Sequence, residues 1–138
     1  MTLVVDASIT LAWILEDERN PTHIALFERV GKQGAFVPQL WRLEVANGLR
    51  SALRRGRITL VFRDESLADL QALDLATDSE TNDNAWSTII ALSDAHNLTP
   101  YDAAYLELAQ RRRLPLATLN SRLAQAARSI GVEVRGLD

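Results

Sequence analysis

The stretch Leu3-Val4-Val5-Asp6-Ala7-Ser8 decides the fold expected for this chain. Three apolar residues in a row are typical of a short buried strand, and Asp6 follows them directly. Asp6 or Ser8 can then cap a helix that continues through Leu11 and Leu15. Because ligands bind beyond the carboxyl ends of parallel strands, Asp6 is also a candidate site residue. Taken alone, Asp6 is more simply explained as a helix N-cap.

Outward from this stretch, short strand patterns alternate with helical ones. Further strands are expected at 35–37, 73–75, 116–119 and 132–134. Helices are expected near 24–34, 40–55, 64–73, 85–96, 100–113 and 121–130, with a polar loop over 78–84. Strands separated by helices indicate βαβ units, hence a parallel sheet with right-handed crossovers. We predict a three-layer α/β/α fold with a central, mostly parallel sheet, in one domain covering residues 1–138.

The bulk composition excludes several classes of protein. A hydrophobic content of 47% and a charged content of 24% are ordinary for a globular domain and argue against disorder. No apolar run approaches the roughly 18 residues that span a bilayer, and no basic leader precedes Asp6. Without Cys there is neither a disulfide nor a thiolate zinc site, which fits a reducing cytoplasm. The net charge of −3 argues against bulk electrostatic binding of duplex DNA but leaves a nuclease open.

A second acid, Glu44, lies on the edge of a helical apolar stripe. Taking about 100° per residue, that stripe is formed by Trp41, Val45, Leu49 and Ala52. Gly48, one turn further on, is a poor helix former that leaves open space beyond Glu44. In isolation, Glu44 is more simply a boundary glutamate with its carboxylate in water.

A third acid, Asp102, shares a helix face with core-type residues such as Tyr105. It also stands third in a helix that Thr99 caps, so a capping role explains it equally well. Acids on core-facing positions cost free energy unless they are paired or bind a cation. In a chain without Cys, three such acids indicate an oxygen-ligand site for a hard divalent metal. The histidines, His23 and His96, show no metal-pair spacing.

Four segments carry a resemblance to a known family. They are Val4-Val5-Asp6-Ala7-Ser8, Trp41-Arg42-Leu43-Glu44-Val45-Ala46-Asn47, Tyr101-Asp102-Ala103-Ala104-Tyr105-Leu106-Glu107-Leu108-Ala109 and Leu116-Ala117-Thr118-Leu119-Asn120. In this order and spacing they resemble the successive motifs of PIN-domain proteins, above all the VapC-type toxins of bacterial toxin–antitoxin pairs. The similarity covers essentially the whole chain.

The resemblance implies a catalytic site for Mg²⁺ or Mn²⁺. Asp6 and Asp102 correspond to direct ligands, and Glu44 to an acid that binds the metal directly or through water. Asn120 stands where the family commonly has a fourth aspartate, so it removes one negative charge and a second metal is less expected. Its amide is expected to accept a hydrogen bond from a metal-bound water. Ser8 and Thr118 correspond to residues that orient waters or acids.

By resemblance, the protein is a Mg²⁺-dependent endoribonuclease that hydrolyses RNA phosphodiesters and is held in check by an antitoxin. The alternative is a catalytically weakened PIN-like module that acts mainly by binding antitoxin or RNA. A receiver or phosphatase-type phosphoacceptor also uses an aspartate after its first strand. For that third class Lys32 is badly placed, and Ser8 stands where a phosphatase would have its second acid.

Two surfaces are candidates for partners. Arg55 lies near the azimuth of Glu44, about 16 Å along the helix, and is a candidate RNA contact. Leu60-Val61-Phe62 and Trp13 are candidates for an apolar groove that, in this family, receives a segment of the antitoxin. A homodimer is implied by the resemblance alone.

Overall fold

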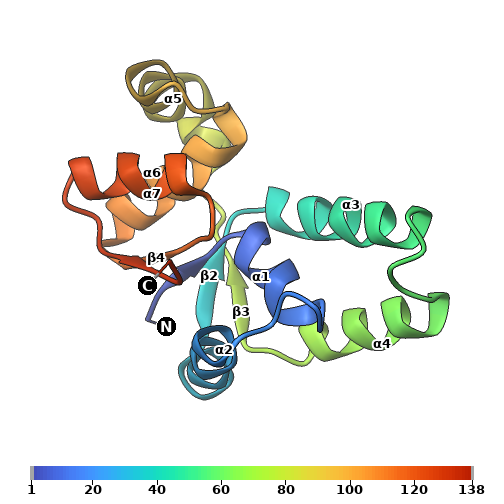
Figure 1. The fold of residues 1–138 in the computed structure, drawn as a ribbon. Helices are drawn as coiled ribbons and strands as arrows, with labels where there is room; N and C mark the ends of the chain where they lie inside the picture. Colours follow the sequence, from blue (N-terminus) through green and yellow to red (C-terminus); the bar gives the residue numbers. More distant parts are fainter. Residues whose placement is uncertain (1, 138) are drawn as a thin grey trace.

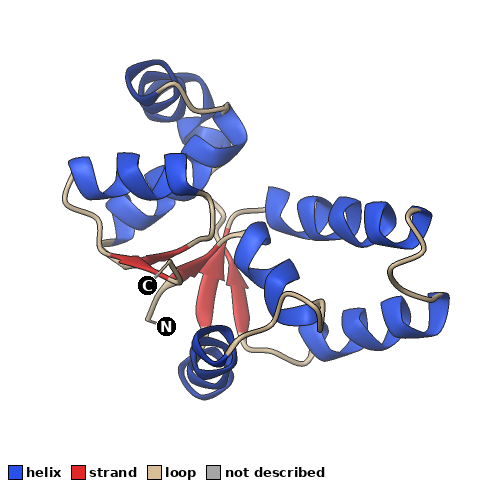
Figure 2. Ribbon diagram, in the orientation of Figure 1, coloured by secondary structure: helices blue, strands red, loops and turns tan. Residues whose placement is uncertain are grey.

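A five-stranded sheet forms the centre of the computed structural model, which describes residues 2–137. All neighbouring strands are parallel, in the order β3-β2-β1-β4-β5 (Figure 2). The strands are β1 (Val4–Val5), β2 (Ala35–Val37), β3 (Leu75–Thr77), β4 (Leu116–Ala117) and β5 (Val134–Arg135). The predicted three-layer α/β/α fold is confirmed, and within the described residues the sheet is parallel throughout.

Helices cover both faces of this sheet. They are α1 (Ala7–Ile14), α2 (Pro21–Gln33), α3 (Leu40–Arg54), α4 (Leu60–Gln71), α5 (Ile90–His96), α6 (Pro100–Arg112) and α7 (Ser121–Ser129). Figure 1 shows α5, α6 and α7 gathered on one side and α1 to α4 on the other, with α3 and α4 as an antiparallel pair reaching away from the sheet. Among residues 2–137, no helix has the length and apolar character needed to cross a bilayer.

The core is densest around β1 and α6. Leu3, Val4 and Val5 are fully buried. Seven consecutive residues of α6, from 103 to 109, are also buried, because this helix lies between the sheet and its neighbours α5 and α7. A helix buried on every side is held rigidly. The residues near its amino terminus are therefore fixed relative to the end of β1.

Several element bounds differ from those the sequence predicts. The helix expected at 64–73 begins four residues earlier, because the Thr59 hydroxyl caps it by accepting from the Phe62 N–H. The strand expected at 73–75 is β3, two residues later. The helix expected at 85–96 begins with a 3₁₀ turn, Asn82–Asn84, and a π-helical turn, Ala85–Ile89. The last strand lies at 134–135 rather than 132–134, since Val132 still bonds back to the end of α7.

Two glycines permit close packing near the carboxyl end of the sheet. The predicted open space at Gly48 is not there, because the side chain of Leu11 fills it and a Cβ at position 48 would collide with it. Gly136 has a φ of +103°, a left-handed conformation that favours glycine. A Cβ there would collide with Ile9 and lie 3.2 Å from the carbonyl oxygen of Thr118. Gly136 thus lets the chain after β5 pass directly beside the end of β4.

Candidate acid site at the carboxyl edge of the sheet

Asp6 is the buried centre of the candidate site. It follows β1, is 4% exposed, and caps α1 by accepting from the Ile9 N–H at 3.0 Å. The same carboxylate oxygen accepts from the Ser8 hydroxyl at 2.7 Å. The other oxygen accepts from the hydroxyl of Thr118, which the parallel pairing of β1 with β4 places beside it. Of the two predicted N-caps, Asp6 is therefore the one that forms, and Ser8 and Thr118 hold its carboxylate.

Burial sets the electrostatics of Asp6. Loss of hydration raises the pKa of its carboxyl, and the hydrogen bonds from Thr118, Ser8 and Ile9 oppose that rise without cancelling it. The negative charge of Asp102 raises the pKa further.

Glu44 lies on the first turns of α3 and is held by a tyrosine. The Tyr105 hydroxyl donates to its Oε1 at 2.6 Å, linking α6 to α3. Burial raises the pKa of Glu44, the tyrosine bond opposes the rise, and the charges of Asp102 and Asp6 add to it. Tyr105 is 1% exposed, and burial beside Glu44 raises the pKa of its phenol well above the usual range. The sequence placed Tyr105 on the core face but did not predict this contact; the one available signal was that a buried tyrosine hydroxyl needs a partner.

Asp102 and Asn120 meet across the first turns of α6 and α7. The Asn120 Nδ2 donates to the Asp102 Oδ2 at 3.2 Å. The Asn120 Oδ1 caps α7 by accepting from the backbone N–H groups of Arg122 and Leu123, at 3.0 and 3.1 Å. Because this oxygen already accepts two backbone hydrogen bonds, its expected hydrogen bond from a metal-bound water stays a prediction. Burial raises the pKa of Asp102, and hydrogen bonds from Thr99 and Asn120 oppose the rise.

The charge of Asp102 therefore raises the pKa of both Asp6 and Glu44, and the charge of Asp6 raises that of Glu44, yet each acid is held by its own hydrogen bonds. Among residues 2–137, no Arg, Lys or His forms an ion pair with any of them. In the same residues, no three His, Cys, Asp or Glu side chains stand close enough together to hold a metal ion as they are placed. The second carboxylate oxygen of Glu44 accepts no hydrogen bond from the described chain. In chemistry, these hard oxygen donors fit a divalent cation such as Mg²⁺. To share one ion, their side chains would have to turn toward each other.

A fourth acid shows what a structural carboxylate looks like in this fold. Asp78 also follows a strand directly, β3, and its side chain is fully buried. Arg111 binds it at 2.7 and 3.1 Å, and Arg112 at 3.0 Å. Burial opposes its ionisation, but the arginine bonds outweigh burial and hold the pKa of Asp78 well below its usual range. Asp6 and Asp78 occupy equivalent positions after their strands, and only Asp78 has cationic partners.

The predicted partner surfaces lie away from the acids. Arg55 is the exposed C-cap of α3, at the end of that helix farthest from the sheet (Figure 1). Leu60 and Val61 are 57% and 66% exposed at the start of α4. Trp13 is half-buried, stacks on Phe27 and lines a cavity of about 230 Å³ between α1 and α4. Trp13 and Phe62 of the predicted groove line this cavity, whereas Leu60 and Val61 do not; its other lining residues include Glu16, Arg19, Glu65 and Asp69.

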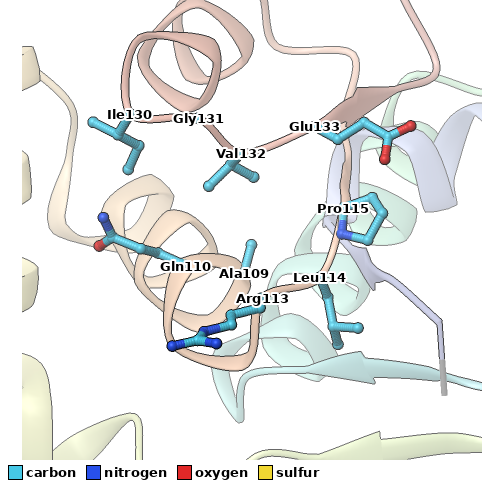
Figure 3. A pocket seen from close by; sticks show the side chains of 9 residues that line it. All are labelled: Ala109, Gln110, Arg113, Leu114, Pro115, Ile130, Gly131, Val132 and Glu133. Carbon is cyan, nitrogen blue, oxygen red and sulfur yellow. The ribbon is translucent and has the colours of Figure 1, made fainter.

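A larger hollow lies at the opposite edge of the sheet. Its volume is about 280 Å³, and it is bounded by the segments that precede β4 and β5 (Figure 3). Its lining contains one acid, Glu133, beside Arg113 and apolar side chains. In parallel sheets, ligands bind at the carboxyl edge, so this hollow is not the candidate site.

The fold and the candidate site together define the class of this protein. It is a parallel α/β domain whose hydrogen-bonded acids lie beyond the carboxyl ends of the central strands. Residues 3–129 match the family model described as PIN domain, and the chain belongs to the PIN-domain family. It is 31% identical to Ribonuclease VapC3 of Pyrobaculum aerophilum over 125 residues, 91% of this chain and 94% of that protein. Its fold is similar to the crystal structure of PAE2754 from the same organism, with a TM-score of 0.71 and 21% identity over 97% of this chain and 90% of that one. The family resemblance is thereby confirmed, and the phosphoacceptor alternative is set aside.

Proposed function

We propose that this protein is a Mg²⁺- or Mn²⁺-dependent endoribonuclease, the toxin of a toxin–antitoxin pair. The observation that carries the proposal is the set Asp6, Glu44 and Asp102, which have raised pKa values and no cationic partner in the described chain. Asp78, with two arginines, shows that the fold pairs a buried acid when that acid is structural. Membership of the PIN family and 31% identity to a ribonuclease support RNA as the substrate.

Each residue of the site has a distinct part in the proposed chemistry. A divalent cation held there would polarise a phosphoryl oxygen and lower the pKa of an attacking water. Asp6 and Asp102 would hold that cation directly, and Glu44 would hold it directly or through water. Thr118 and Ser8 keep the Asp6 carboxylate in one orientation, and Tyr105 does the same for Glu44.

Cleavage by the purified, antitoxin-free protein tests this function. We expect cleavage of a structured RNA with Mg²⁺ or Mn²⁺, none in EDTA, and recovery when excess metal is restored. Cleavage that persists in EDTA would reject the metal-dependent mechanism.

A catalytically weakened module is the second candidate, and two observations favour it. Asn120 supplies no carboxylate, and the three acids do not share a common point within the described residues. Such a module would bind antitoxin or RNA with the affinity of a toxin but would cleave no RNA at any Mg²⁺ or Mn²⁺ concentration.

We assign the antitoxin to the hollow between α1 and α4. The half-buried Trp13 and Phe62 line this hollow, and the exposed Leu60 and Val61 directly precede Phe62 on α4, which suits the apolar face of a partner segment. Arg55 is assigned to RNA phosphate contact, which positions a strand without reading its sequence. A homodimer acting in the cytoplasm completes the proposal.

Removing the hydroxyl that holds Glu44 tests the geometry of the site. We expect Tyr105→Phe to keep the fold, since the ring still fills its buried position, and to weaken Mg²⁺ binding by about 10- to 100-fold. Isothermal titration calorimetry measures this affinity. Tyr101→Phe is the matched control, because Tyr101 lies on the same helix and is 63% exposed. Removing its hydroxyl should leave the Mg²⁺ affinity nearly unchanged. Wild-type affinity in Tyr105→Phe would show that the phenol does not position Glu44.

A further inference from the structure

We propose that Asn120 is a positioning residue that clamps Asp102, and that its neutral amide limits the acid site to one divalent cation. This inference deepens the proposed metal site and rests on it for the cation count. The clamp itself rests only on the contacts of the protein.

The orientation of the Asn120 amide is fixed by its partners. Backbone N–H groups can only donate, so the atom facing Arg122 and Leu123 must be the amide oxygen. The amide nitrogen is therefore turned toward the Asp102 Oδ2, at 3.2 Å. One side chain thus caps α7 and binds the acid on α6. The two helices that bring Asp102 and Asn120 to the sheet edge are tied together at the site.

The net charge of the acid cluster follows from its residue types, because the amide of Asn120 is neutral. Asp6, Glu44 and Asp102 together carry three negative charges when ionised, so one divalent cation leaves a single negative charge. A second cation would make the cluster positive, and the amide nitrogen offers it no lone pair. A carboxylate at position 120 would raise the total to four negative charges, which two divalent cations would balance. The sequence alone cannot distinguish a ligand from a clamp at position 120.

A double-mutant cycle without metal tests the clamp. Asn120→Asp keeps the helix cap, since Asp and Asn are comparable N-caps, but sets a carboxylate oxygen against the Asp102 Oδ2. In EDTA at pH 8, we expect this change to lower the thermal midpoint by about 4 °C or more. In the Asp102→Asn background, the penalty should disappear because an amide can donate to the new carboxylate. Equal shifts in both backgrounds would overturn the clamp.

The matched control makes the same substitution at another N-cap. Asn20 caps α2 by accepting from the His23 N–H, and its amide faces no carboxylate among the described residues. Asn20→Asp should leave the thermal midpoint within about 1 °C of the wild type, or raise it through the helix dipole. If Asn20→Asp lowered the thermal midpoint as much as Asn120→Asp does, the effect would come from the changed helix cap and not from Asp102. That result would overturn the clamp.

Mn²⁺ titration, with bound metal counted by calorimetry or electron paramagnetic resonance, tests the cation limit. We expect one ion per chain in the wild type and two in Asn120→Asp. Two ions in the wild type, or unchanged Mn²⁺ binding in Asn120→Asp, would overturn the limit. Absence of Mn²⁺ binding by the wild type would reject the metal-dependent function, while the metal-free cycle would still decide on the clamp.

Discussion

Asp102→Asn is expected to reduce RNA cleavage by about a hundredfold or more while leaving the fold intact. Residues that merely orient metal ligands typically cost 10- to 100-fold when replaced, so a direct ligand should cost at least the upper end of that range. The substitution removes the charge that raises the pKa of both Asp6 and Glu44. It spares the helix cap, because the Thr99 hydroxyl caps α6 by accepting from the backbone N–H of residue 102, which the substitution keeps.

Two measurements accompany that assay. Without metal, the thermal midpoint of Asp102→Asn should equal or exceed that of the wild type, since one repelling charge is gone. Mg²⁺ should stabilise the wild type against thermal unfolding, and this stabilisation should be largely lost in Asp102→Asn. Asp94→Asn, the same substitution at an exposed position on α5, is the control and should cleave normally. Wild-type turnover by Asp102→Asn would remove Asp102 from the site.

The largest effect on stability is expected at Arg111. Its guanidinium binds the fully buried Asp78 and also Glu107, whose side chain is 2% exposed. Arg111→Met keeps the aliphatic part of the side chain but leaves Glu107 without its cation and Asp78 with Arg112 alone. Removing one member of a buried ion pair typically costs 3 to 5 kcal/mol, and we expect a loss of about 3 kcal/mol or more in the free energy of unfolding. Urea unfolding at pH 7 measures it.

The pH dependence of that loss has a definite sign. Because the arginines hold the pKa of Asp78 below its usual range, its ionisation stabilises the fold at neutral pH, and this contribution fades as the pH falls below about 4. The difference between wild type and Arg111→Met should therefore shrink on acidification. Arg63→Met, which loses only the exposed partner Asp64, should cost less than about 1 kcal/mol. A comparable loss of unfolding free energy in both variants would show that the ion pairs of Arg111 contribute no more to stability than an exposed ion pair does.

Hydrophobic periodicity predicted the layers and the parallel sheet, but not several local features. The π-helical turn at 85–89 is a single turn inside a longer helical run, too short to leave an apolar period of its own, so the sequence pattern does not reveal it. The start of α4 was missed because Leu60 and Val61 are exposed, which breaks the apolar stripe of that helix. The Thr59 cap was the signal that could have corrected it.

The identities of the candidate site residues were accessible from motifs, and their contacts were not. Tyr105 and Glu44 are 61 residues apart in the sequence, and Arg111 and Asp78 are 33 apart. Local sequence spacing therefore predicts neither contact. For the same reason, Asp6 and Asp78 look alike in sequence, and only folding reveals which of them has arginine partners. The helix cap of Asn120 is the exception, since an Asn directly before a helical run is an N-cap signal in the sequence itself.

Gly136 has a consequence for any genetic selection on this protein. A library of random substitutions, scored for survival of cells that express it, should return position 136 among the inactivating sites although it lacks a reactive group. Every other residue there must displace Ile9 and press on the backbone of the strand that presents Thr118. Steric constraint alone therefore requires glycine at position 136. A survey of tolerated mutations would for this reason overstate the number of residues that take part in the reaction.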